Sequence, residues 1–177
     1  MSGAITSIFA AAVLAGAALS ARSDEACVDF KWDTTQEHAL FAGRADSLNL
    51  GADPKSAPMI ELRHLYELHL LPQDRVSFAV APGKRDPAVG ANAGLANFKI
   101  PAPGSYRVSV DAPFWIDVVS NGARVVAKDF QGQHGCSPPN KIVEFELLGT
   151  RPFVLQLSNA TAGSVRLTVT ATPARKL

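Results

Sequence analysis

The sequence predicts an all-β domain: an antiparallel, jelly-roll-like β-sandwich with one short N-terminal helix and one disulfide. Apolar side chains fall on every second position in about eight or nine short segments of residues 64–172, and turn residues separate these segments about every 8–15 positions. One segment near the N-terminus has a helical pattern, and the chain holds two cysteines. Strict alternation is typical of sheets with one buried and one solvated face. An open barrel would have nearly the same pattern.

Length and composition indicate a single folded domain. The chain has 177 residues, of which 47% are hydrophobic and 19% charged. This composition is typical neither of a disordered tail nor of a bundle of membrane helices. Seventeen basic and sixteen acidic residues give a formal net charge of +1. This balance argues against a nucleic-acid partner, because such proteins usually carry a basic face.

The first 21 residues contain no charged side chain, and residues 5–19 are mostly small or apolar. Small residues then follow at the spacing that signal peptidase accepts. About 15 weakly hydrophobic residues are too few to span a bilayer well. We therefore expect a signal peptide at residues 1–21, a mature domain at residues 22–177 that is periplasmic or secreted, and no stable membrane insertion after cleavage. An uncleaved anchor and a buried helix are the alternatives.

The two cysteines, Cys27 and Cys136, both fall in the mature part. Two cysteines in an exported chain most simply pair with each other. Closing a loop of roughly 110 residues would stabilise the fold by about 4–5 kcal/mol if the effect is chain entropy alone. Two buried free thiols are the alternative.

A short helix is expected after residue 33. Asp33 with Gln36, or Thr34 with Glu37, has the capping-box spacing, and Gly43 stands where the helix would end. The inward positions are expected to be Ala39, Leu40 and Ala42.

The strands are expected in order along the rest of the chain. Residues 44–60 contain glycine and prolines and are expected to be a loop. Residues 66–70 and 76–80 alternate, and a connector of hairpin length joins them. Further strands are expected at 98–100, 106–110, 114–118, 124–130, 143–147, 153–157 and 165–169.

Two turns in this part of the chain stand out. The Asn121-Gly122 pair is the strongest hairpin signal in the chain. Residues 81–97 are rich in glycine and proline and longer than most hairpin loops, so this segment is either a mobile flap or a loop that carries a site.

Metal-ligating patterns are weak. Glu67 and His69 project from the same strand face, whereas His64 has the opposite parity. The spacings typical of zinc and calcium sites do not occur. We expect a solvated polar face here, with no metal and no cofactor.

Catalytic patterns are equally weak, and no catalytic residue is predicted. The sequence has no Gly-x-Ser-x-Gly elbow. Glu144 and Glu146 share a strand face, where they would lie side by side instead of across a cleft. We expect these glutamates to be solubilising and to pair across strands with Arg107 or Arg166.

The candidate binding residues are Trp115, Asp117, Lys84, Arg85 and Asn92. If the apolar neighbours of Trp115 fill the core, its ring lies on the outer face beside Asp117 and could be a flat platform for a sugar or peptide. A loop or the N-terminal helix covering this ring is the alternative. The other three residues lie in the long Gly/Pro-rich loop.

Several segments resemble known groups. Residues 104–110 (GSYRVSV), 115–119 (WIDVV), 152–158 (PFVLQLS) and 165–170 (VRLTVT) are similar in rhythm to accessory β-sandwich domains of secreted bacterial proteins, such as pre-peptidase C-terminal domains and carbohydrate-binding modules. The likeness covers roughly residues 64–172. Those domains often bind calcium, and no acidic loop here matches theirs.

The segments Cys27 to Trp32 (CVDFKW), Glu37 to Phe41 (EHALF) and WIDVV resemble a group of small exported proteobacterial proteins, some of which carry the label homogentisate 1,2-dioxygenase. That enzyme is a longer cupin protein whose iron site has two histidines and a glutamate, and no cupin His-x-His motif occurs here. No functional residue is carried over from either group.

The sequence therefore favours an exported, non-catalytic binding or interaction domain whose partner is an envelope polymer or protein. The alternative is a metal-dependent, dioxygenase-like enzyme or a hydrolase, with a site assembled from distant strands.

Overall fold

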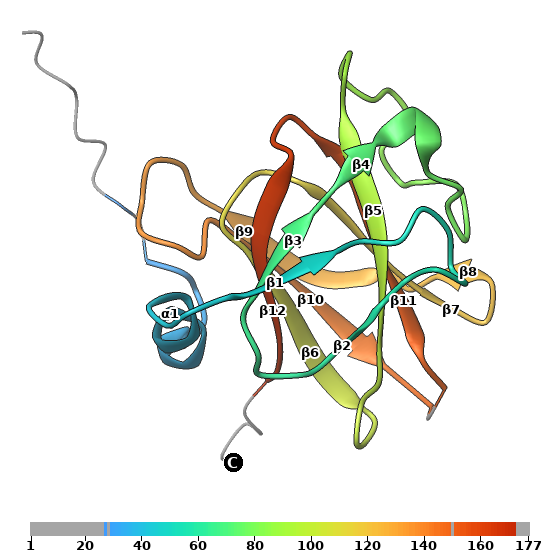
Figure 1. Cartoon of the computed structure of the whole chain (residues 1–177). Helices are drawn as coiled ribbons and strands as arrows, with labels where there is room; N and C mark the ends of the chain where they lie inside the picture. Colours follow the sequence, from blue (N-terminus) through green and yellow to red (C-terminus); the bar gives the residue numbers. More distant parts are fainter. Residues whose placement is uncertain (1–26, 28, 150, 173–177) are drawn as a thin grey trace, which may run out of the picture.

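The computed structural model describes residue 27, residues 29–149 and residues 151–172, so the predicted signal peptide lies outside the described residues. The described part contains twelve strands in two sheets, one α-helix and one 3-10 turn. The two sheets pack face to face (Figure 1). The predicted all-β sandwich with a short N-terminal helix is confirmed. Among the described residues, no helix has the length and apolar character needed to cross a membrane.

One sheet, here called sheet A, contains six strands. In spatial order they are β1 (Asp46–Asn49), β3 (Tyr66–His69), β12 (Ser164–Ala171), β6 (Gly104–Val110), β10 (Lys141–Leu147) and β9 (Ala127–Gly132). The helix α1 (Thr35–Phe41) lies against its outer face, where it contacts β12.

The second sheet, sheet B, also contains six strands. In spatial order they are β2 (Met59–Ile60), β5 (Asn92–Phe98), β11 (Phe153–Ala160), β7 (Trp115–Ser120) and β8 (Ala123–Arg124), and β4 (Leu71–Pro72) pairs with β5. The 3-10 turn η1 (Gln73–Arg75) follows β4.

Alternate side chains of each strand form the core between the sheets. Val108 and Val169 from sheet A are 1% exposed, and Leu155 from sheet B is fully buried. The rings of Phe98 and Phe153 stack across β5 and β11 with centroids 5.5 Å apart. In these strands the period-two alternation of the sequence therefore identifies the buried face correctly.

Two pairs of strands run parallel, contrary to the antiparallel prediction. β1 pairs with β3, and β2 pairs with β5, both in parallel register. The chain leaves β1 in sheet A, forms β2 in sheet B and returns to β3, and such a crossover allows parallel pairing. The prediction that residues 44–60 are only a loop was wrong, because β1 and β2 come from this segment.

The predicted hairpin at Asn121-Gly122 is present and joins β7 to β8. Both turn residues have positive φ, 50° and 75°, as a two-residue hairpin turn requires. The expected returning strand at 124–130 is divided: β8 pairs with β7 in sheet B, and β9 pairs with β10 in sheet A.

The helix is present, but its inward face differs from the prediction. Glu37 and Phe41 are buried, whereas Ala39 and Ala42 are exposed. The Thr34 side chain forms no capping bond. The helix rests on a polar part of sheet A, so a glutamate faces inward, and an apolar pattern cannot identify that face.

The predicted disulfide between Cys27 and Cys136 is confirmed, with the two Cα atoms 5.8 Å apart. It joins the described residues before α1 (27 and 29–34), here called the N-terminal arm, to the loop between β9 and β10. The arm is also held along β9, since the Lys31 backbone N–H donates to Gln131 Oε1 at 2.9 Å.

Candidate functional site

Residues 76–91, here called the strap, connect η1 to β5 without forming a strand (Figure 1, green). The predicted strand at 76–80 was therefore wrong. Gln156 of β11, which is fully buried, explains the difference. Its Oε1 accepts hydrogen bonds from the backbone N–H of Ala79 at 2.7 Å and of Val80 at 3.2 Å, and its Nε2 donates to the Val80 carbonyl at 3.2 Å. The side chain satisfies the backbone groups that a neighbouring strand would otherwise bind.

Asp117 of β7 holds the middle of the strap. The residue is 8% exposed, and its Oδ2 accepts a hydrogen bond from the Gly83 backbone N–H at 2.9 Å. Its Oδ1 accepts one from Trp115 Nε1 at 3.2 Å. The Ala88 N–H also donates to Asn159 Oδ1 at 2.7 Å, so side chains of β7 and β11 fix the strap to sheet B at several points.

The strap covers part of Trp115, and 38% of this residue stays exposed. Its indole N–H is already bonded to Asp117, so the exposed remainder offers ring carbon and no free donor. Lys141 Nζ lies 5.7 Å from the ring centroid and donates to the Phe114 carbonyl at 2.6 Å. Burial lowers the pKa of Lys141, and the nearby Asp117 partly opposes this shift. Trp115 therefore lies on the outer face of sheet B beside Asp117, as predicted.

Gly83 lies where the strap approaches the sheet most closely. A Cβ atom at this position would stand 2.6 Å from Trp115 Nε1 and 3.0 Å from Asp117 Oδ1. We predict that Gly83→Ala displaces the strap or the indole, lowers stability by about 1–3 kcal/mol and shifts the tryptophan emission. Gly163→Ala is the matched control, because nothing lies within 4 Å of a Cβ there. Identical emission spectra and unfolding curves for the two variants would contradict this close contact.

Gln156 gives a second prediction for the strap. Gln156→Leu leaves two strap N–H groups without their partner, and we expect a loss of about 1–3 kcal/mol in the free energy of unfolding. The loosened strap should also be cut faster by trypsin after Lys84 or Arg85, which limited proteolysis with mass spectrometry measures. Gln36→Leu, on α1, is the control. Equal cleavage rates in both variants would show that Gln156 does not hold the strap.

Lys84, Arg85 and Asn92 line one hollow of about 910 Å³ between the strap, η1 and the start of β5. Arg124 of β8 completes its wall. Proline, alanine and glycine residues and Phe78 form much of the remaining lining. We call this space the strap hollow. Three of the five candidate binding residues are therefore brought together.

Trp115 and Asp117 line a neighbouring hollow of about 470 Å³, here called the Trp115 hollow. Arg124 lines both hollows. Sequence reasoning missed Arg124, although it stands two residues after the hairpin turn. Its position opposite Val119 of β7 follows from that turn, and this register was the available signal.

The strap hollow is electropositive. Lys84, Arg85 and Arg124 line it, and Asp74 is the acidic residue in its lining. None of the ion pairs formed within the described part of the chain involves these three cations. Arg124 Nη1 donates to the Ala81 carbonyl at 2.8 Å, which orients the guanidinium and leaves its other donors available.

The weak metal candidates are not gathered into one site. His64 Nε2 contacts Asp46 Oδ2 at 2.8 Å, and His69 Nε2 contacts Ser47 Oγ at 2.9 Å. His69 belongs to β3, whereas His64 precedes this strand, so the two histidines contact different residues of β1, and Glu67 is exposed. Within the residues that the structure describes, no group of three or more histidine, cysteine, aspartate or glutamate side chains could hold a metal.

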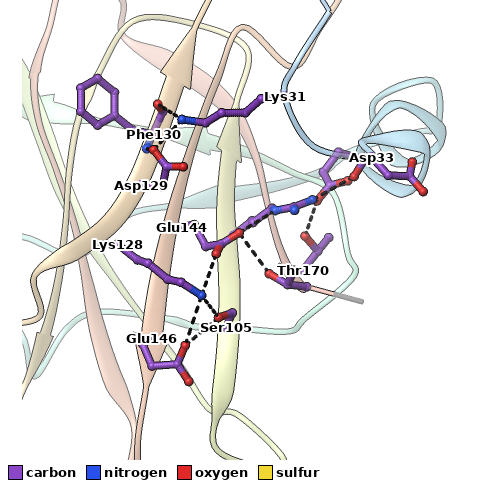
Figure 2. Close-up of polar contacts among 12 residues, drawn as sticks. Lys31, Asp33, Ser105, Lys128, Asp129, Phe130, Glu144, Glu146 and Thr170 are labelled. Carbon is purple, nitrogen blue, oxygen red and sulfur yellow. Dashed lines mark hydrogen bonds and ion pairs between the residues drawn. The ribbon is translucent and has the colours of Figure 1, made fainter. Parts of the chain in front are cut away.

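A buried charged cluster lies on the outer face of sheet A, beneath α1 (Figure 2). Arg107 Nε contacts Glu144 Oε2 at 3.2 Å, and Arg107 Nη1 lies 3.8 Å from Glu37 Oε1. Arg107 Nη1 also donates to the Asp33 carbonyl at 2.9 Å. We call Arg107, Glu37 and Glu144 the Arg107 cluster. The predicted pairing of Glu144 with Arg107 is confirmed, whereas Arg166 pairs with Asp111 at 2.9 Å.

The carboxylates of the Arg107 cluster are occupied. Glu144 Oε1 contacts Lys128 Nζ at 3.2 Å, and Glu37 Oε1 accepts the Thr170 hydroxyl at 2.7 Å. Both glutamates are at most 5% exposed, so the expectation that Glu144 is a solvated, solubilising residue was wrong. Glu37 thus contacts Arg107 of β6 and Thr170 of β12, and these contacts hold α1 against the sheet.

Two aspartates, Asp33 and Asp129, flank this cluster. The Thr35 backbone N–H, which donates to Asp33 Oδ1, is the main cause of the lowered pKa of Asp33. The Lys31 ammonium, at 2.6 Å from Asp129 Oδ1, lowers the pKa of Asp129 (Figure 2). Both interactions tie the N-terminal arm and the start of α1 to their places.

The whole sequence was also compared with models of known protein families and with curated proteins. No family model matches the chain, and no curated protein matches it.

Proposed function

We propose that this chain is an exported, non-catalytic binding domain for an envelope polymer or protein, and that its site is the strap hollow together with the Trp115 hollow. One observation carries the proposal: buried side chains of sheet B hold the strap from beneath, while cations of the strap line an open hollow. Gln156 and Asp117 are 0% and 8% exposed, and Lys84 and Arg85 are exposed. Binding residues on a loop that is already ordered lose less entropy on association.

The polar groups at this site suit recognition better than proton transfer. Both oxygens of Asp117 accept hydrogen bonds, from Gly83 and Trp115. Lys84 and Arg85 are exposed cations. These groups provide charge, donors and an aromatic surface for a partner.

Two features support export to the periplasm or the exterior. The uncharged N-terminal run has the composition of a signal peptide. The pairing of Cys27 with Cys136 fits an oxidising compartment. Cell fractionation and N-terminal sequencing of the mature protein test this part. A protein that keeps residues 1–21 and partitions with membranes would contradict it.

The binding proposal is tested by capture of partners from an envelope extract and by glycan-array binding, with the mature domain as bait. We expect a partner whose binding is weakened by Trp115→Ala and by the double variant Lys84→Gln/Arg85→Gln. The control Arg44→Gln/Lys99→Gln removes the same charge at other exposed positions. No bound partner in either assay, or equal weakening by the control, would overturn the proposal.

A further inference from the structure

We infer that the two hollows together bind an acidic polysaccharide, which lies across Arg124 with its charged groups in the strap hollow and a sugar ring on Trp115. This inference rests on the proposed binding function and names the chemistry of its ligand. It requires three things of the surface: unneutralised cations, a continuous path and an apolar surface for a ring. The described residues provide each of them.

The cations come first. Lys84, Arg85 and Arg124 converge on the strap hollow against one acidic lining residue, Asp74. A buried or paired cation would be unavailable, but the ion pairs of the described residues involve none of the three. Guanidinium groups bind carboxylates in a two-point geometry, and ammonium groups act as point charges.

Arg124 makes the path continuous. It lines both hollows, and its Nη1 is fixed to the Ala81 carbonyl at 2.8 Å. A ligand that extends from one hollow to the other would contact Arg124 where the two meet. The hollows have volumes of about 910 and 470 Å³, more than a single small anion requires, so an extended ligand fits them better than a free ion.

Trp115 provides the surface for a ring. Its N–H donates to Asp117, so its exposed part can make only apolar and π contacts. The C–H face of a sugar ring makes such contacts, and the sugar hydroxyls stay free for Asn92 and the strap backbone. An acidic peptide would satisfy the cations but has no flat C–H face at regular spacing, so we favour the sugar.

The test is calorimetric titration of the mature domain with defined probes: an alginate hexasaccharide, a neutral dextran oligosaccharide of equal length, inorganic polyphosphate and a poly-glutamate peptide. We expect alginate to bind best and to weaken as salt rises. Lys84→Gln/Arg85→Gln and Arg124→Gln should each weaken alginate binding about tenfold, the change expected when about 1.4 kcal/mol of charge-assisted contact is lost. Trp115→Ala should reduce the gain in affinity between a disaccharide and a hexasaccharide, and Arg44→Gln/Lys99→Gln should bind as wild type.

The outcomes separate this inference from the proposed function. Polyphosphate or poly-glutamate binding as tightly as alginate would show that charge alone is recognised, and would overturn the sugar assignment. Binding of the dextran but not of alginate would overturn the acidic assignment. If none of the anionic probes binds while envelope capture still depends on Lys84 and Arg85, the inference fails and the binding function stands. Failure of both assays removes both.

Discussion

Arg107→Met is expected to lower the free energy of unfolding by about 3–5 kcal/mol, because it leaves Glu37 and Glu144 buried without their shared cation. Domains of this kind are stable by about 5–15 kcal/mol, so the loss is a large fraction of the total. Urea unfolding followed by circular dichroism measures it. The substitution keeps an unbranched side chain, shorter than that of arginine, and removes its charge and hydrogen bonds.

Two further variants distinguish a charge effect from a packing effect. Arg166→Met breaks a more exposed ion pair with Asp111 and should cost about 1 kcal/mol. Adding Glu37→Gln and Glu144→Gln to the Arg107→Met protein should recover part of its loss, since the unpaired charges are then removed. If the triple variant is no more stable than Arg107→Met, or if Arg166→Met costs as much, buried charge is not what makes Arg107 important.

Loss of the disulfide is the second large effect that we predict. The double variant Cys27→Ala/Cys136→Ala should lose about 2–5 kcal/mol, because an unfolded chain without the cross-link gains conformational entropy over a 109-residue separation. The folded state should keep its β-rich circular dichroism, since the sandwich core does not include either cysteine.

Chemical reduction provides the matched control. A reducing agent should lower the urea midpoint of the wild-type protein to that of the double variant, and should leave the midpoint of the double variant unchanged. A wild-type midpoint that does not respond to reduction, under conditions in which thiol titration shows two free cysteines, would mean that the cross-link contributes nothing to stability.

The sequence alone determined the sandwich, its strand faces and its cross-link. Alternation at residues 106–110 and 165–169 identifies the side chains that pack between the sheets, because strand side chains alternate between two faces regardless of what surrounds them. The Asn121-Gly122 turn is equally local, since its residues supply the positive φ angles by themselves. The chain has two cysteines, so only one intramolecular disulfide is possible.

Only the tertiary structure decided where alternation does not mean a strand and where polar residues turn inward. Residues 76–80 alternate, but Gln156 from a distant strand binds their backbone, and local sequence cannot show a partner 76 residues away. Glu37 faces inward because Arg107 of β6 lies opposite it on the sheet. Its burial therefore depends on a positive charge that only folding brings close. The same holds for Arg124 beside Lys84 and Arg85: a site formed by side chains from separate segments exists only once long-range packing has placed them together.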